Sequence, residues 1–140
     1  MPLILSSEAQ MVRDTAHEFF KERAPITALR RLRDTNDPDG FSRALWREMA
    51  ELGWTGFLVP EDFGGTEFGV LGLAQVMEAA GRTLAASALV STGLVGASLL
   101  AMAGSDDQKA EHSGEAAAVQ VVHRHCVRVV QRVPAGVGVN

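Results

Sequence analysis

Glu61 and Asp62 are neighbouring carboxylates that could be pictured as a general acid and a general base. Such a pair works when its surroundings separate the two pKa values and both groups reach one reacting atom. Residues adjacent in sequence rarely converge in this way, and an exposed turn offers no burial to separate their pKa values. We therefore interpret both side chains as solvated and not as a catalytic pair.

The glycine-rich segment 64–69 could hold a phosphate group through its backbone amides. It lacks the G-x-G-x-x-G order, however, and no clear strand precedes it and no lysine follows it. Two adjacent glycines, Gly64 and Gly65, are typical of a tight turn. The sequence therefore predicts a structural turn at this point, with no cofactor-binding residue.

His123, His125 and Cys126 are metal-ligating residue types, and alternate positions on a strand face the same way. No second cluster completes a tetrahedral set, so we predict no metal site. Cys126 is the only cysteine and cannot close an intrachain disulfide. Because residues 1–7 also lack the pattern of a secretory signal, a cytoplasmic location is expected.

The composition divides the 140 residues into two segments. Residues 1–111 contain 14 Leu and 10 Lys or Arg against 16 Asp or Glu, whereas residues 112–140 contain 9 Val, no Leu and three Arg against one Glu. We predict a helical domain over 1–111 and an irregular or disordered tail over 112–140. The tail is either the product of a translation-frame change near Glu111 or a native extension. The net charge of −4 argues against nucleic acid as a partner.

Periodic apolar residues predict that the helical domain is all-α. In the first helix, one side carries Val12, Ala16, Phe19 and Phe20, which predicts one buried stripe. A first helix is expected to begin at a capping box of Ser7 and Gln10 and to end near Ala24, before Pro25. A basic turn over 30–33 and a loop over 34–40 should follow it. The next expected elements are a helix from Ser42 to the terminating Gly53, an extended piece over 54–59, a helix over 70–80 ended by Gly81, and a helix starting at 105–108.

Residues 84–103 form a run of 20 residues without a charge, which is long enough to cross a bilayer. Its serine, threonine and glycine content opposes insertion, so a buried core helix is favoured over a membrane span. Such a helix must be covered on all sides. Its small residues would allow neighbouring helices or a ligand chain to approach closely.

Four segments in order resemble the N-terminal helical domain of acyl-CoA dehydrogenases, over residues 3–111. They are the segments 5–10 (LSSEAQ), 46–53 (WREMAELG), 59–65 (VPEDFGG) and 104–109 (GSDDQK). The family pattern has a Leu-Pro pair after the last segment, and Ser113 follows here without it. The resemblance ends at that point.

The resemblance implies a flavoprotein family that oxidises the Cα–Cβ bond of acyl-CoA thioesters. In that family a carboxylate removes the α-proton and FAD accepts a hydride from the β-carbon. The flavin is held by a middle β-domain and a C-terminal helical domain, which also carries the usual catalytic glutamate, and members are homo-oligomers. The resemblance further implies that the N-terminal domain forms one wall of the acyl cavity, with Ser87, Ala88, Ser91 and Val95 near that wall.

We therefore expect a truncated dehydrogenase-like domain that neither catalyses nor binds FAD alone, because the middle and C-terminal domains are missing from it. Surfaces made for those domains should be exposed and apolar. Two alternatives remain open. One is a stand-alone helical module that binds a partner protein, and the other is a membrane-associated hairpin over Val70–Ala103.

Overall fold

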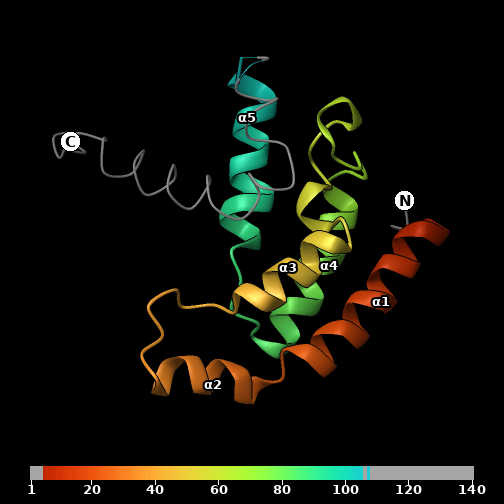
Figure 1. Ribbon diagram of the computed structural model, residues 1–140. Helices are drawn as coiled ribbons and strands as arrows, with labels where there is room; N and C mark the ends of the chain where they lie inside the picture. The colour runs from red at the N-terminus through yellow and green to blue at the C-terminus, as the bar shows by residue number, and fades with distance from the viewer. Residues whose placement is uncertain (1–4, 106, 108–140) are drawn as a thin grey trace, which may run out of the picture.

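All regular secondary structure in the residues that the computed structural model describes, 5–105 and 107, is helical (Figure 1). The predicted all-α class is confirmed for these residues, and the segment 112–140 lies outside them. The elements in chain order are α1 (Ser7–Arg23), α2 (Ile26–Asp34), α3 (Arg43–Glu51), η1 (Trp54–Gly56), η2 (Glu61–Phe63), α4 (Val70–Thr83), η3 (Leu89–Gly96) and α5 (Ala97–Ala103).

The cap of α1 is Ser6, one residue before the predicted Ser7. Ser6 has an extended backbone, and its Oγ accepts a hydrogen bond of 3.2 Å from the amide of Ala9. The side-chain nitrogen Nε2 of Gln10 donates to the carbonyl of Leu5 at 3.1 Å, so this side chain does not close a capping box. The helix ends at Arg23, directly before Ala24, as predicted.

The basic segment around Arg30 forms helix α2, so the prediction of a turn there was wrong. Leucine, alanine and arginine are good helix formers, and Leu29 and Leu32 cover part of their surface against the body of the domain. The hydroxyl of Thr35 donates to the carbonyl of Arg31 at 2.8 Å where the helix ends. The loop that follows is the expected one, although Asp34 itself is still helical.

Helix α3 begins and ends as its sequence predicts. Ser42 accepts a hydrogen bond from the amide of Leu45 at 3.3 Å, and Gly53 takes the left-handed conformation with φ of 77° that ends the helix region. The extended piece expected over 54–59 is wrong, because residues 54–56 form the short helix η1. The turn places the side chain of Trp54 in the core, where it is buried.

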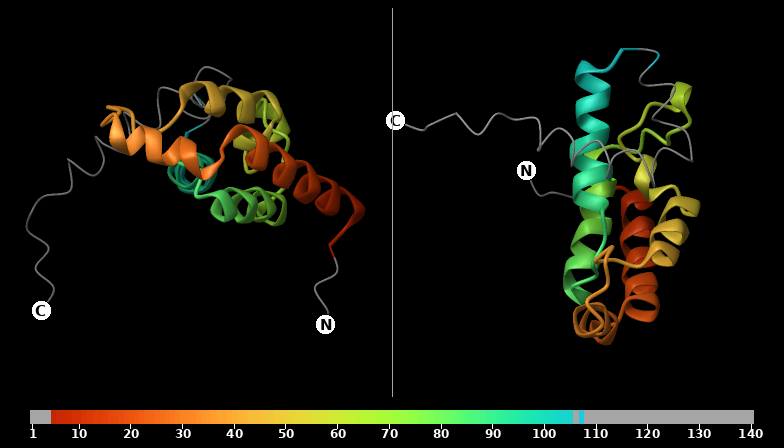
Figure 2. Two further views of the ribbon diagram at one scale, coloured as in Figure 1. Left: turned by 90° about the horizontal axis from the view of Figure 1, so that it is seen from below. Right: turned by 60° about the vertical axis from the view of Figure 1, so that its left-hand side comes forward.

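The core lies where α1 packs against α4, with α3 and η1 closing a third side (Figure 2). Its largest fully buried side chains are Trp46, Phe20, Met49, Leu73, Leu89 and Val76. The ring of Phe19 packs edge-on against Phe20 and Trp54, with centroid distances of 5.2 and 5.1 Å. The stripe predicted for the first helix is confirmed, because Ala16 and Phe20 are completely buried.

The uncharged run 84–103 does not form a single helix. Helix α4 passes through Gly81 and ends at Thr83, and Leu84 adopts the left-handed conformation with φ of 53°. An irregular linker then leads to η3, which is π-helical, and to the seven-residue α5. Small residues such as Gly93 and Gly96 weaken the preference for a regular α-helix here. Within the described part of the chain, no helix combines the length and apolarity that a membrane span requires.

Candidate functional site

The four residues predicted to line an acyl cavity lie in η3 and in the two residues that precede it. Ser87 and Ala88 are half-buried in the linker before η3. Ser91 and Val95 are exposed on successive turns of η3. The structure thus gathers the four residues on one short stretch of backbone, and their role in binding stays a prediction.

The hydroxyl groups of both serines are engaged with the local backbone. Ser91 Oγ donates to the carbonyl of Ala88 at 3.1 Å. Ser87 Oγ lies 3.5 Å from the amide of Leu89, a long hydrogen bond at the first residue of η3. These contacts tie both side chains back to the first turn of η3.

Large apolar side chains are exposed along η3 and α5, in a strip that we call the η3–α5 face. It consists of Val90, Val95, Leu99 and Met102, whose exposed fractions are 55, 45, 57 and 86%. Val95, Leu99 and Met102 are spaced by four and three residues, so they follow one side of a helix. Exposed apolar side chains that gather on one side of an element are typical of an interaction surface.

The opposite side of η3 is packed against the domain through small residues. A Cβ placed on Gly93 would lie 3.2 Å from Cδ1 of Leu89 and 3.9 Å from Cδ1 of Leu73 on α4. Gly96 and Ala97 are also buried. Among the described residues, the uncharged run is therefore covered on one side, whereas we expected cover on all sides. Apolar side chains are exposed on the other side, as the sequence predicted for part of the surface.

The glycine-rich turn uses its amides internally. Gly65 donates to the carbonyl of Pro60 at 3.1 Å, Thr66 to that of Gly56 at 3.1 Å and Glu67 to that of Val59 at 3.1 Å. An added Cβ on Gly65 would come within 1.9 Å of the Val59 carbonyl oxygen, so this glycine is required for close packing. The segment is a structural turn, as predicted, and these amides are not available to hold the phosphates of a flavin cofactor.

The other polar residues that invited a chemical reading do not form a site. Glu61 and Asp62 are exposed on η2, which confirms that they are solvated. No group of three metal-ligating side chains occurs within residues 5–105 and 107. His123, His125 and Cys126 lie outside those residues.

Titratable groups with shifted pKa values lie on other helices. The Arg23 guanidinium on α1 lowers the pKa of Glu48 on α3 through a hydrogen-bonded ion pair. Arg82 lowers the pKa of Glu78 in the same way, one turn along α4. The first pair joins α1 to α3 and the second lies within α4. Neither belongs to the η3–α5 face, so neither supplies an acid or base to it.

The sequence reasoning missed Leu99 and Met102 as members of the candidate surface. Nearly every residue around them is apolar or small, so the periodicity that separates an exposed side from a buried one is weak. The π-helical geometry of η3 adds to the difficulty because it changes the angle between successive residues. Only the positions of the glycines, which face the domain, could have indicated the outward side.

Comparisons with known proteins agree on one family. The family profile for the N-terminal domain of acyl-CoA dehydrogenase matches residues 6–120. Benzylmalonyl-CoA dehydrogenase of Aromatoleum aromaticum is 34% identical over 112 residues, which cover 76% of this chain and 28% of the relative. Acyl-CoA dehydrogenase IpdE2 of Mycobacterium tuberculosis is 30% identical over 113 residues, covering 80% and 35%. The chain therefore spans roughly a third of these curated relatives. No solved structure matches it significantly.

Proposed function

The chain belongs to the acyl-CoA dehydrogenase family, of which it carries the N-terminal helical domain, and from this premise we propose that it forms one wall of an acyl-CoA-binding cavity. The wall is built on η3, with Ser87, Ala88, Ser91 and Val95 beside the acyl chain. The remaining walls come from a middle domain and a C-terminal domain. In this arrangement the described residues contact the acyl chain and shape its cavity, and the reacting groups lie elsewhere.

The observation that carries the proposal is the exposure of the η3–α5 face. An apolar residue such as Leu99 is left 57% exposed on a helix whose other side is well packed. Burying such side chains against a further domain or an acyl chain contributes about 25 cal/mol for each Å² removed from water. The face therefore has the character of an internal surface of a larger protein.

The short side chains at the start of η3 support the position of the acyl chain. Ser87, Ala88 and Ser91 do not extend far from the backbone, and the two hydroxyls are directed to neighbouring backbone groups. An acyl chain could therefore approach the helix without displacing a bulky side chain. Val95 adds an apolar surface one turn further on.

The flavin and the catalytic carboxylate are proposed to reside outside the described residues. FAD, where it is bound in the family, accepts the hydride from the substrate. The glycine turn at 64–69 does not fit the phosphates of FAD, because the amides of Gly65, Thr66 and Glu67 already donate hydrogen bonds within the turn.

The substrate class that we propose is an acyl-CoA, because both curated relatives are CoA-ester dehydrogenases by name. Cytoplasmic location and homo-oligomeric assembly also stay predictions.

A domain exchange tests this function. Residues 6–105 would replace the matching segment of the Aromatoleum aromaticum benzylmalonyl-CoA dehydrogenase, and the chimera would be assayed with the substrate of that enzyme. Val95→Trp and Ser91→Trp should raise KM because the larger rings occupy the acyl space. Ala74→Trp, at an exposed position of α4, is the matched control and should leave KM unchanged. An active chimera whose KM is the same in all three variants would show that η3 does not line the cavity.

A stand-alone interaction module remains the second candidate, because the η3–α5 face could equally hold a partner protein. The two functions differ in what the isolated chain does. A module should be a soluble monomer that melts cooperatively, whereas a cavity wall should expose apolar surface and aggregate. Light scattering during thermal unfolding separates the two outcomes.

A further inference from the structure

Helix α2 lies across one end of the bundle and is covered only in part by the rest of the domain. Figure 1 and the right-hand view of Figure 2 both place it at that end. None of its nine residues is fully buried. Ala28, Leu29 and Leu32 are half-buried, and the other residues, among them Arg30 and Arg31, are exposed. Most of the surface of this helix is therefore open to a further contact.

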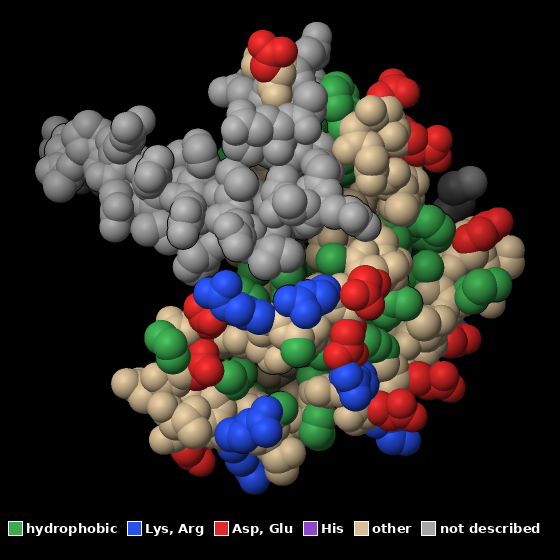
Figure 3. All heavy atoms as spheres, in the orientation of Figure 1, with side chains coloured by type: hydrophobic (Ala, Val, Ile, Leu, Met, Phe, Trp, Pro, Cys, Tyr) green, Lys and Arg blue, Asp and Glu red, His purple; other side chains and the backbone are tan. Residues whose placement is uncertain are grey.

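Positive charge is concentrated in and around this helix. Residues 23–47 contain six Arg and three Asp, whereas the other described residues contain three Lys or Arg and eleven Asp or Glu. The net charge is thus +3 for the first group and −8 for the second. Figure 3 shows Lys and Arg side chains only in the lower part of the molecule, and the charged side chains in the upper part are acidic. The domain is therefore electrically polarised, although the chain as a whole is acidic.

The aspartates of the segment 23–47 are already engaged. Asp34 forms an ion pair with Arg33 at 2.8 Å, and Asp39 pairs with Arg43. Asp37 accepts hydrogen bonds from two backbone amides of its own loop, at 3.0 and 3.2 Å. These carboxylates therefore do not offset the remaining arginines through ion pairs.

Three arginines of the segment are exposed and unpaired. Arg30 and Arg31 on α2 and Arg47 on α3 form no ion pair with a described residue. Arg23, the remaining arginine of the segment, is held by Glu48. The positive charge of α2 is therefore free to act on a group outside the domain.

The last turns of α1 add no positive charge to this surface. Lys21 lies between Glu18 and Glu22 in sequence, and all three side chains are exposed. Residues three and four apart are neighbours on a helix, so the two carboxylates offset the lysine. The cationic surface is therefore set by the arginines that follow α1.

An exposed apolar pair adjoins the unpaired arginines. Pro25 and Ile26 occupy the corner at which α1 meets α2, and Ile26 is 44% exposed. Ile26 and Arg30 are four residues apart, so they lie on the same side of α2. A stable protein interface needs a larger apolar centre, and Ile26 is the only large apolar residue of α2 that is mainly exposed. Cations beside one apolar side chain are instead typical of a helix that lies on a lipid surface.

We propose that α2 docks on the surface of a bilayer that contains anionic lipids. Arg30, Arg31 and Arg47 are attracted to the negatively charged headgroups, and Ile26 enters the boundary between headgroups and acyl chains. The acidic remainder of the domain is repelled by the same lipids, so the distribution of charge orients the chain with α2 toward the bilayer. The chain lies on the membrane and does not cross it. This surface is separate from the η3–α5 face, and the proposal does not depend on the acyl cavity.

The attraction depends on charge and therefore on salt. Exposed charges are screened beyond a Debye length of about 10 Å at 0.1 M ionic strength and about 3 Å at 1 M. The full chain should float with vesicles of equimolar phosphatidylserine and phosphatidylcholine at low salt, and it should be released as salt is raised. Vesicles of phosphatidylcholine alone should not bind it at either salt concentration.

Substitutions locate the contact on α2. Arg31→Gln should weaken vesicle binding about fivefold, and Arg30→Gln/Arg31→Gln about thirtyfold. Arg13→Gln makes the same change on α1, outside the segment 23–47, and should leave binding nearly unchanged. Ile26→Ser should weaken binding, whereas Leu71→Ser, at a position that is 43% exposed on α4, should not. Circular dichroism establishes that each variant is folded.

A gain of binding provides an independent check that a loss of fold cannot imitate. Asp34→Asn removes the carboxylate that holds Arg33 and so frees a further cation on α2. This variant should bind the anionic vesicles about fivefold more tightly than the original chain. Unchanged or weaker binding would contradict the docking of α2.

Four further outcomes would overturn the proposal. The first is a chain that does not bind the anionic vesicles at low salt, or that binds phosphatidylcholine equally well. The second is a folded double arginine variant of α2 that binds like the original chain. The third is binding that is lost only with Val95→Gln/Leu99→Gln or only with Arg128→Gln/Arg132→Gln, because either result would assign the contact to another part of the chain. The fourth is tighter binding to a DNA duplex at the same salt, which would assign the arginines to a nucleic acid.

Discussion

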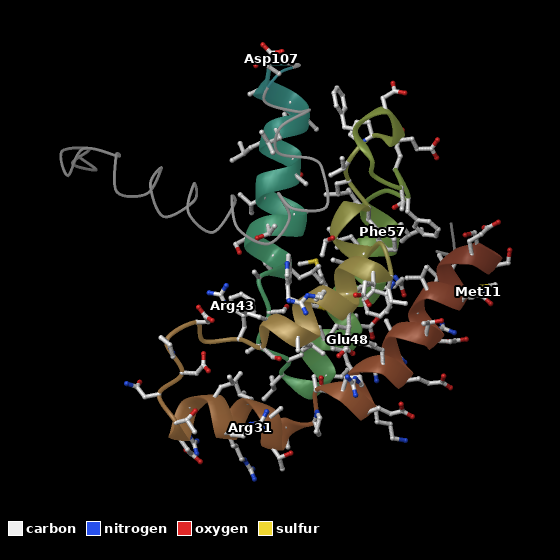
Figure 4. The ribbon with its side chains drawn as sticks, in the orientation of Figure 1. Met11, Arg31, Arg43, Glu48, Phe57 and Asp107 are labelled. Atoms are coloured by element: carbon white, nitrogen blue, oxygen red, sulfur yellow. The ribbon has the colours of Figure 1, made fainter. Side chains whose placement is uncertain are left out.

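Arg23 at the end of α1 holds Glu48 of α3 through two hydrogen bonds, although 25 residues separate them in sequence. Arg23 Nε donates to Glu48 Oε2 at 2.7 Å, and its terminal nitrogen donates to Oε1. This two-pronged geometry is specific to arginine and a carboxylate. Figure 4 shows Glu48 between α3 and α1. The pair fixes the end of the first helix on the third.

The ion pair predicts an acid-dependent loss of stability. Arg23 keeps the pKa of folded Glu48 below its ordinary value of 4.5. A depressed carboxyl pKa contributes stability that is fully present above the unfolded value and is lost as pH falls through the folded value. Glu48→Gln should therefore lower the free energy of unfolding at neutral pH, and the difference should shrink below about pH 4. The effect is small because the pair is partly exposed.

Urea unfolding of both proteins at neutral and acidic pH measures this difference. Glu61→Gln removes an exposed carboxylate that has no ion pair in the described chain, and it serves as the control. A difference between Glu48→Gln and the original chain that is the same at all pH values would show that the pair does not contribute through its charge.

Phe20 is one of the largest fully buried side chains of the core. It is completely buried and contacts both Phe19 and Trp54. Phe20→Ala should cost about 3 to 5 kcal/mol in the free energy of unfolding, through lost burial and the cavity left behind. Met11→Ala, on the exposed side of the same helix, should change it by less than about 0.5 kcal/mol. Equal losses for the two variants would mean that α1 does not pack through Phe20.

Two glycine-to-alanine changes should act in opposite directions. At Gly65 the added Cβ would meet the carbonyl of Val59, so Gly65→Ala should destabilise the domain by about 1 to 3 kcal/mol. Gly81 lies within α4 with open space around its Cβ position, and Gly81→Ala should stabilise by about 0.4 to 1 kcal/mol. Thermal melts of both variants measure the two signs. A Gly65→Ala variant with unchanged stability would contradict the close contact between the turn and Val59.

The η3–α5 face should control the solubility of the chain. Val95→Gln/Leu99→Gln replaces two exposed apolar residues, so the soluble yield should rise while the free energy of unfolding stays nearly constant. Binding of a dye specific for apolar surface should fall in parallel. Leu71→Gln, at another exposed apolar position, is the control and should change dye binding less. Unchanged dye binding in the double variant would show that the face is not an accessible apolar surface.

The sequence predicted those elements whose signals are local. The Ala16 and Phe20 stripe, the left-handed Gly53 and the glycine turn each follow from spacing or from a backbone conformation that few residues adopt. Helix α2 was not predicted because its only apolar spacing, Leu29 to Leu32, is a single turn long and is interrupted by arginines. The division of 84–103 was missed because no charge or proline marks Leu84, whose left-handed conformation ends α4.

The candidate surface was only partly accessible to the same reasoning. Ser87, Ala88, Ser91 and Val95 came from the resemblance, since their residue types alone point to no ligand. The outward orientation of Val95 and Leu99 depends on where η3 packs, which is a tertiary property. The pairing of Arg23 with Glu48 is likewise set by the packing of α1 against α3, and their sequence separation gives no hint of it.

The absorption spectrum of the purified chain after incubation with FAD, measured together with acyl-CoA oxidation, tests the central claim most directly. The claim is that this domain contributes a wall and that the reacting groups lie outside the described residues. We predict a colourless protein after removal of free flavin, with no turnover. A stoichiometric yellow complex that oxidises an acyl-CoA would contradict the account.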